Sequence, residues 1–145
     1  MQRTTEDHHI VKELQPSGII YGDRDRLGQV LTNFMTNAIK YSPKANKIIV
    51  KTVVDKSNVT LSVQDFGLGL TLEDQTKVFE RFYRVSGLNQ STYPGLGLGL
   101  YIASEIIKRH KGSVWVESKK AKGSTFYFSL PITKQKSKQL KGSVR

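Results

Sequence analysis

Apolar residues along the chain follow two spacings. In some segments they alternate with polar residues, and in others they recur at helical intervals. The alternating or β-branched segments predict six strands, at residues 8–14, 17–22, 47–55, 58–65, 113–118 and 124–131. The helical spacing predicts long helices within residues 23–43 and 100–110, and a short helix over residues 72–79. Residues 80–99 show little periodicity and are rich in Gly, Ser, Asn and Gln, which is typical of a loop.

Capping and turn residues separate these elements. Asp23 can cap the first long helix, and Pro43 lies just past its end. Turns at residues 56–57 and 120–123 close two hairpins, and Gly112 stands where a glycine commonly ends a helix. This order of elements predicts an α+β fold in which one mixed sheet carries helices on one face.

The composition is typical of one globular domain. The 145 residues suit a single core, and hydrophobic residues make up 37%. Because the chain has no cysteine, disulfides and cysteine-based zinc sites are excluded. The apolar runs are too short to span a membrane, and the N-terminus has no signal-peptide pattern. We therefore expect a soluble domain, which is compatible with a membrane-anchored parent protein.

Much of the net charge of +11 lies at the C-terminus. Residues 134–145 contain five basic residues and no acidic one, which leaves 18 basic and 12 acidic residues, or +6, for the rest. This composition predicts a folded domain over residues 1–133 and a disordered tail over residues 134–145. The distribution argues against a nucleic-acid partner, and a moderately basic body suits an anionic ligand such as a nucleotide.

The stretch SVQDFGLGL, residues 62–70, contains the Asp-Phe-Gly triplet that holds magnesium in eukaryotic-type protein kinases. Such a kinase also needs a His-Arg-Asp motif, which is absent, and a chain long enough for two lobes. The Walker pattern of P-loop proteins is absent as well. Taken alone, an Asp followed by Gly at a strand end is typical of a simple turn.

The first long helix carries a polar stripe beside its apolar stripe. Asn33 and Asn37 lie four residues apart, and Lys40 and Tyr41 follow one turn later. An amide oxygen is a suitable ligand for Mg²⁺, and an ammonium group attracts phosphate. Two amides, an ammonium and an aromatic ring could therefore serve a cation, a phosphate and a base. A solvated polar face fits the same pattern.

Two glycine-containing stretches could approach a flat, charged ligand. In residues 65–70, Asp65 can accept a hydrogen bond from an exocyclic amine such as that of adenine. Gly67 and Gly69 would let the backbone come close to the base. In residues 94–106, alternating glycines precede a helix, where backbone N–H groups can meet phosphate. The same glycines could form the hinge of a lid.

The stretch VFERFYR, residues 78–84, combines aromatic and basic residues. Phe79, Phe82 and Tyr83 could anchor a mobile loop, and Arg84 could reach a terminal phosphate. A small satellite core would explain the aromatic residues equally well, but it would not explain Arg84. We expect the following loop, residues 84–97, to be mobile without a nucleotide and to become ordered over a bound one.

These stretches, in this order and spacing, resemble the catalytic, ATP-binding domain of bacterial two-component sensor histidine kinases. QVLTNFMTNAIKYSP is similar to the family's N box, DFGLGL to its G1 box, VFERFYR to its F box and GLGLGL to its G2 box. The resemblance covers roughly residues 8–132 and places the chain among the Bergerat-fold ATPases. It implies a two-layer α/β sandwich with one mixed, mostly antiparallel sheet, covered on one face by about three helices.

The resemblance also implies roles for individual residues. Asn37 would hold Mg²⁺, with Asn33 close by, and Arg84 would contact the phosphates, so these three are the candidate catalytic residues. Asp65 would read the adenine amine. The full set of candidate ATP-binding residues comprises Asn33, Asn37, Lys40, Tyr41, Asp65, Gly67, Gly69, Leu70, Phe79, Arg84, Gly95, Leu96, Gly97, Leu98, Gly99 and Leu100. Leu70 and Leu96 are minor departures from the residues common in the family.

The residue at position 33 bears on whether ATP is hydrolysed or its phosphoryl group is transferred. Hydrolysing relatives have a Glu one turn before the metal-binding Asn, where it activates water as a general base. A neutral amide cannot take that proton, so we expect phosphoryl transfer to another nucleophile instead of efficient hydrolysis. A gyrase-like ATPase and a nucleotide-sensing module without activity are the alternatives.

The expected acceptor is a histidine on a separate helical dimerisation domain, which this sequence lacks. His8 and His9 lie in a predicted strand and are interpreted as surface or sheet residues. His110 ends a helix, where a positive charge would be favourable, and is interpreted as structural. A response regulator would act downstream. The resemblance implies a cytoplasmic domain, monomeric in isolation, of a parent anchored in the bacterial inner membrane.

Overall fold

The computed structural model describes residues 9–13, 20–42, 47–85, 98–132 and 143–144. Its elements, in chain order, are β1 (His9–Glu13), β2 (Ile20–Tyr21), α1 (Arg24–Tyr41), β3 (Lys47–Val54), β4 (Asn58–Asp65), α2 (Leu72–Lys77), α3 (Gly99–Arg109), β5 (Ser113–Lys119), β6 (Gly123–Pro131) and β7 (Ser143–Val144). Most elements lie within a residue or two of the predicted positions. The exception is the second predicted strand, and the short helix α2 ends two residues earlier than predicted.

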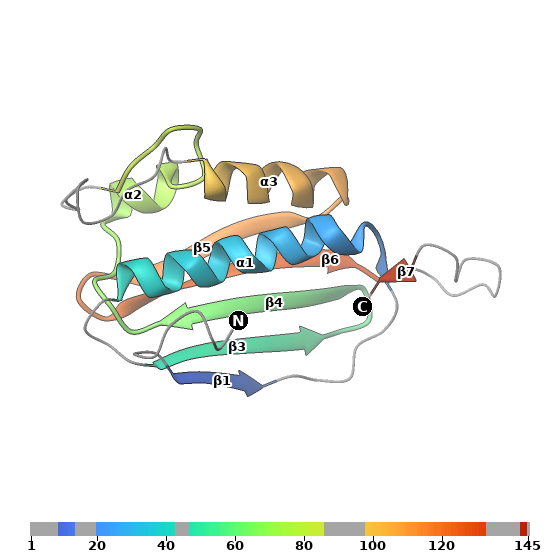
Figure 1. Ribbon diagram of the computed structural model, residues 1–145, viewed down its shortest axis with the longest axis horizontal. Helices are drawn as coiled ribbons and strands as arrows, with labels where there is room; N and C mark the ends of the chain where they lie inside the picture. Colours follow the sequence, from blue (N-terminus) through green and yellow to red (C-terminus); the bar gives the residue numbers. More distant parts are fainter. Residues whose placement is uncertain (1–8, 14–19, 43–46, 86–97, 133–142, 145) are drawn as a thin grey trace.

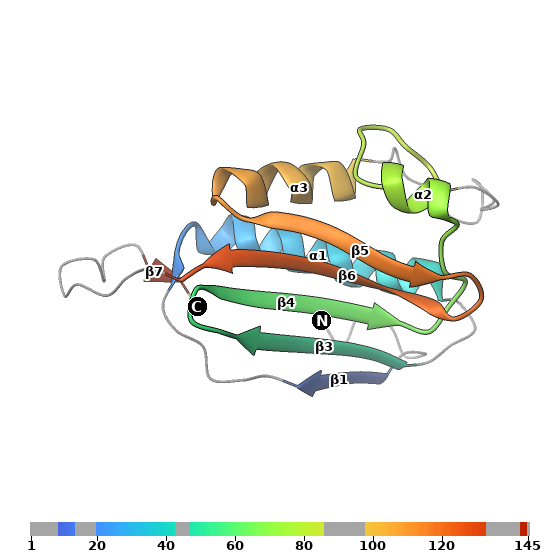
Figure 2. The same ribbon diagram turned by 180° about the vertical axis from the view of Figure 1, so that it is seen from behind.

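Five strands form one mixed sheet in the order β1-β3-β4-β6-β5 (Figures 1 and 2). Strands β1 and β3 are parallel, and the other neighbours are antiparallel. The helices cover one face of this sheet, with α1 and α3 side by side. The predicted α+β, two-layer architecture is therefore confirmed.

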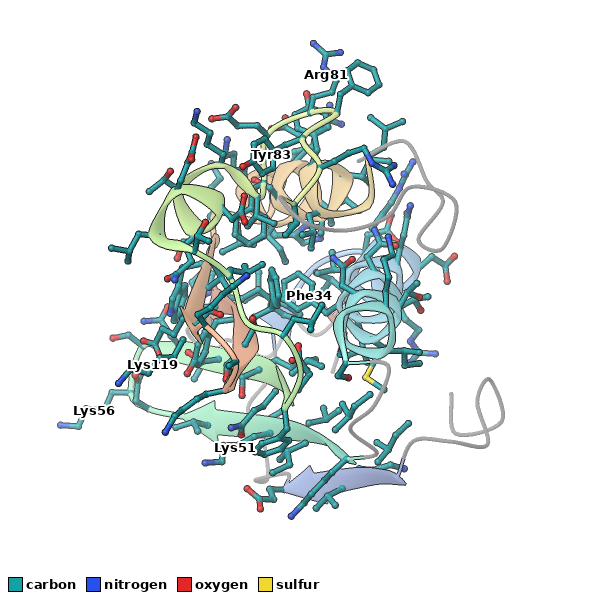
Figure 3. All side chains as sticks on the ribbon, turned by 90° about the vertical axis from the view of Figure 1, so that its left-hand side faces the viewer. Phe34, Lys51, Lys56, Arg81, Tyr83 and Lys119 are labelled. Carbon is teal, nitrogen blue, oxygen red and sulfur yellow. The ribbon has the colours of Figure 1, made fainter. Side chains whose placement is uncertain are left out.

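The core lies between the helices and the sheet. Strand β6 turns alternate residues toward the helices, so that Phe126, Phe128 and Leu130 are buried. The ring of Phe34, on the apolar stripe of α1, lies 5.7 Å from the Phe126 ring and 5.9 Å from the Phe128 ring, centre to centre. Figure 3 shows Phe34 between α1 and the sheet. The opposite face of the sheet carries the intervening side chains, among them Tyr127.

Helix α1 begins as the sequence predicts. The Asp23 carboxylate accepts hydrogen bonds from the backbone N–H groups of Asp25 at 3.0 Å and Arg26 at 3.2 Å. The helix ends at Tyr41, where the hydroxyl of Ser42 donates to the Ala38 carbonyl at 2.6 Å. These contacts satisfy backbone groups that a helix leaves unpaired at its ends.

The end of α3 corrects the role that the sequence suggests for Gly112. Lys111, with φ of 66°, is the residue in the left-handed conformation. Its N–H donates to the carbonyl of Lys108 at 3.0 Å, and the N–H of Gly112 donates to that of Ile107 at 2.9 Å, which is a Schellman motif. Glycine is needed at position 112 for another reason, because a Cβ there would overlap the carbonyl oxygen of Ser129 on β6.

His110 links the two long helices. Its Nδ1 is 2.8 Å from the carbonyl oxygen of Ile106, and its Nε2 accepts a hydrogen bond from the backbone N–H of Asp23 at 3.0 Å. These two contacts join the end of α3 to the start of α1 and are compatible with the structural role that the sequence suggests for His110.

Two further differences concern short strands. The second predicted strand, at residues 17–22, contains only Ile20–Tyr21 as strand among the described residues. These residues pair antiparallel with Ser143–Val144, within the segment predicted to be a disordered tail. Nothing in the polar sequence around residue 143 indicates this pairing, because the two strands are far apart in the chain.

Candidate functional site

Several candidate stretches meet at one end of the molecule. Figure 1 shows the C-terminal end of α1, the end of β4, helix α2 and the first turn of α3 at the same end of the two layers. The turn between β5 and β6 also lies there (Figure 2). The described parts of the four motifs are therefore neighbours in space as well as in sequence order.

Asp65 is a buried carboxylate at the end of β4. The residue is only 1% exposed. Its Oδ1 accepts hydrogen bonds from the backbone N–H groups of Gly67 at 3.0 Å and Ser124 at 3.3 Å. These donors fix the orientation of the carboxylate and stabilise its charge. The neighbouring Phe66 is 41% exposed, which agrees with its having no part in this arrangement.

The loop after Asp65 is fastened to the β5–β6 hairpin. The N–H of Ala121 donates to the Leu68 carbonyl at 2.7 Å, and the N–H of Leu70 donates to the Ser118 hydroxyl at 2.7 Å. Gly69 has φ of +71°, and a Cβ on it would overlap the carbonyl oxygen of Lys119. Close packing against this hairpin, which the sequence alone did not indicate, thus requires glycine here.

The polar stripe of α1 is not a solvated face. Asn37 is 8% exposed, although it is an amide on the side of a surface helix. The Asn33 side chain donates from Nδ2 to the carbonyl oxygen of Gly99 at 2.9 Å, which ties α1 to the first residue of α3. The side chain of Tyr41 lies outside the described residues.

Lys40, near the end of this stripe, is influenced by a second cation, Arg84. Partial burial, and secondarily the positive charge of Arg84, lower the pKa of Lys40 from its usual value of 10.5. Lys40 belongs to α1 and Arg84 to the segment after α2, so the fold brings together two positive charges that are 44 positions apart in the chain. Like charges in a partly buried place favour the binding of an anion.

The segment after α2 departs from the prediction at Phe82. Phe79 packs edge-on against Phe126, with ring centres 6.0 Å apart, and serves as the predicted anchor. Phe82 is 61% exposed and has φ of 66°, so it does not anchor the segment. Val85, which no sequence pattern singled out, is buried in the core in its place.

The described part of the glycine-rich stretch begins at Leu98. Gly99 starts α3, and Leu100 is 6% exposed within the core. The carbonyl of Leu98 accepts from the N–H of Ile102 at 2.8 Å. Gly95, Leu96 and Gly97, together with most of the predicted lid, lie outside the described residues.

The described residues contain no group of three or more His, Asp or Glu side chains that could hold a metal ion by themselves. A magnesium ion bound mainly through phosphate oxygens and a single amide does not need such a group. Among the described helices, none combines the length and the apolar character that a membrane span requires.

Similar proteins of known class identify the family to which this chain belongs. Residues 22–134 match the family described as histidine kinase-, DNA gyrase B- and HSP90-like ATPase, and the chain belongs to this family. It is 40% identical over 115 residues to the sensor histidine kinase WalK of Bacillus subtilis, a match that covers 78% of this chain and 19% of WalK. It is 39% identical over 117 residues to the adaptive-response sensory kinase SasA of Thermosynechococcus vestitus, covering 79% and 30% of the two chains.

Solved structures agree with this class. The mycobacterial sensor histidine kinase MprB superposes with a TM-score of 0.80 at 28% identity, over 90% of this chain and 87% of that one. The nucleotide-free catalytic domain of the histidine kinase ThkA superposes with a TM-score of 0.71 at 29% identity, over 92% and 85%. The domain is thus a histidine kinase catalytic domain of the ATP-binding type, and it spans less than a third of the length of WalK and SasA.

Proposed function

We propose that this domain binds Mg-ATP at the end of the molecule described above and donates the γ-phosphoryl group to a histidine on a separate helical dimerisation domain. The observation that carries the proposal is the buried amide of Asn37 on α1, one turn before Lys40, a partly buried lysine whose pKa is lowered in part by the positive charge of Arg84. The kinship to sensor kinases and the structure of full-length ShkA in complex with AMPPNP, at a TM-score of 0.74 and 27% identity over 88% of this chain and 26% of ShkA, support ATP as the nucleotide.

The residues present fit this ligand. The buried and oriented carboxylate of Asp65 suits the exocyclic amine of adenine, which is a hydrogen-bond donor. Lys40 and Arg84 supply positive charge for the phosphates. The amide oxygen of Asn37 would be the protein ligand of Mg²⁺, and the bound ion would neutralise phosphate charge during transfer. We assign Gly67, Gly69, Leu70 and Phe79 to the adenine side of the site. Gly67 donates to Asp65, the loop with Gly69 and Leu70 packs against the β5–β6 hairpin, and Phe79 packs against Phe126.

Asn33 favours transfer over hydrolysis. Its amide nitrogen already donates to the Gly99 carbonyl, and a neutral amide cannot remove a proton from water. We therefore assign Asn33 to holding α1 and α3 together at the phosphate end of the site. The histidine of the acceptor domain would be the nucleophile, and a response regulator would receive the phosphoryl group. We also propose a cytoplasmic site of action, as for a parent anchored in the bacterial inner membrane.

The test is phosphoryl transfer between separate domains. The purified chain is mixed with the helical dimerisation domain of its parent, ATP and Mg²⁺, and both acid-labile phosphohistidine and released inorganic phosphate are measured. We expect phosphohistidine to accumulate faster than phosphate is released. Rapid phosphate release without phosphohistidine would favour a gyrase-like ATPase, and neither product would favour a nucleotide-sensing module.

A further inference from the structure

A hydrogen bond to a buried carboxyl group holds the segment that carries Arg84 against α2. Asp74, on α2, is 1% exposed, and its Oδ1 accepts a hydrogen bond from the Tyr83 hydroxyl at 2.5 Å. The N–H of Asp74 donates to the hydroxyl of Thr71, the cap of α2, at 3.0 Å. Because a buried carboxylate is costly without donors, this contact is a strong restraint on Tyr83. Figure 3 shows Tyr83 near α2 and α3, while Arg81 projects away from them.

The chain between these partners makes a tight turn. The N–H of Glu80 donates to the Lys77 carbonyl at 2.9 Å, and the N–H of Tyr83 donates to the Glu80 carbonyl at 3.2 Å. Phe82 sits in this turn with φ of 66°, a left-handed backbone conformation that is unfavourable for a non-glycine residue. A turn that contains such a residue needs contacts elsewhere to persist, and the Tyr83–Asp74 bond is one of them.

Arg84 lies between two anchors. On one side the Tyr83 hydroxyl is bound to Asp74, and on the other side Val85 is buried in the core. The backbone of Arg84 is therefore held on both sides, although its own long side chain has many rotamers. Fixing the backbone reduces the entropy that is lost when the guanidinium group binds a phosphate.

We propose that Tyr83 is a positioning residue, whose hydrogen bond to Asp74 holds Arg84 where it can contact the β- or γ-phosphate of ATP. The inference rests on the proposed function, because it requires Arg84 to bind these phosphates. A purely structural role for Tyr83 would make a different prediction. Loss of packing would weaken the binding of every nucleotide alike. Loss of positioning would weaken the binding only of nucleotides that have a β- or γ-phosphate for Arg84 to contact.

The experiment measures the Kd of Mg-ATP by calorimetry and that of AMP by NMR titration. The variants are Tyr83→Phe, Arg84→Ala and the double variant, each held well below its unfolding temperature. Tyr127→Phe is the matched control, because it removes a hydroxyl that donates to a carboxylate, that of Glu117 at 2.8 Å, on the opposite face of the sheet.

We expect Tyr83→Phe to weaken Mg-ATP binding by about five- to tenfold and AMP binding by less than about twofold. The double variant should be no weaker than Arg84→Ala, because two residues that act through one contact are not additive. Tyr127→Phe should bind both nucleotides like the unaltered chain. If Tyr83→Phe does not fold, Asp74→Asn replaces it, with an expected loss of about threefold for Mg-ATP alone.

Four results would overturn the inference. Equal losses for ATP and AMP, or additive losses in the double variant, would show that Tyr83 does not act through Arg84. An effect of Arg84→Ala with none of Tyr83→Phe would refute the positioning role and leave the proposed function intact. No effect of Arg84→Ala would instead refute the phosphate contact assigned to Arg84, and the positioning role with it.

Discussion

Replacing Lys40 should weaken ATP binding without lowering the stability of the fold. Replacing it by Met keeps most of the apolar side chain but removes a partly buried charge close to Arg84. A hydrogen bond to a charged group contributes about 1.5–3 kcal/mol, and partial exposure favours the lower end because solvent screens the charge. A loss of about 1.5 kcal/mol corresponds to roughly tenfold weaker Mg-ATP binding.

The same substitution should not destabilise the protein without ligand. It removes the cost of burying the ammonium group and its repulsion from Arg84, so the free energy of unfolding should stay unchanged or rise by up to about 1 kcal/mol. Lys51→Met is the matched control, since Lys51 lies on the sheet away from the helices (Figure 3), 3.8 Å from the Glu13 carboxylate. Calorimetry gives the affinity, and urea denaturation gives the stability.

The pH dependence follows from the same shift. Because the pKa of Lys40 is lowered, the free domain loses this charge at a lower pH than an ordinary lysine would. Phosphate binding favours the protonated form and raises the pKa again, so ATP affinity should fall as the pH rises through the lowered pKa, with proton uptake on binding. A Lys40→Met variant that unfolds more easily, binds Mg-ATP normally and keeps the proton uptake would refute this account of Lys40.

Three other predictions concern the base, the loop fold and the lid. The unaltered chain should bind ATP at least about tenfold more tightly than GTP, because the guanine carbonyl would face the Asp65 carboxylate, and Asp65→Asn should reduce that preference. Calorimetry with both nucleotides measures the two affinities, and equal affinities in the unaltered chain would count against the role of Asp65. Gly69→Ala should destabilise the fold by about 2 kcal/mol or more in urea denaturation, because its φ is +71° and its Cβ would overlap a carbonyl, whereas Gly28→Ala, with open space around it in α1, should stabilise by about 0.5–1 kcal/mol. Hydrogen exchange over residues 84–97 should slow most with an ATP analogue and less with ADP; equal exchange in all states would exclude a nucleotide-responsive lid.

Features with a local cause could be predicted from the sequence. The start of α1 follows from Asp23 and the apolar spacing, and the buried stripe around Phe34 follows from the same periodicity. The hairpin between β3 and β4 is another example, because the Asp55 carboxylate accepts from the N–H groups of Ser57 and Asn58 within the turn itself. Each of these depends on residues a few positions apart.

Features that depend on distant contacts could not be predicted. The need for glycine at Gly112 comes from Ser129, and the need at Gly69 comes from the Lys119 carbonyl, 50 positions later. The hydrogen bond from Leu70 to the Ser118 hydroxyl, which holds the loop after β4, could not be predicted either, because an isolated serine in a strand belongs to no recognisable sequence pattern. The influence of the Arg84 charge on Lys40 is likewise a product of the tertiary fold.

The most direct test of the proposed site is the magnesium dependence of ATP binding in the Asn37→Asp variant. The unaltered chain should bind Mg-ATP with a Kd in the micromolar range or weaker, about −5 to −8 kcal/mol, and less tightly when EDTA removes Mg²⁺. In Asn37→Asp a buried carboxylate would face the negatively charged phosphates, so the affinity for Mg-ATP should fall by at least about tenfold. Gln64→Glu, the same chemical change on the opposite face of the sheet, should bind normally. Normal, magnesium-dependent binding by Asn37→Asp would contradict the placement of the nucleotide at this end of α1.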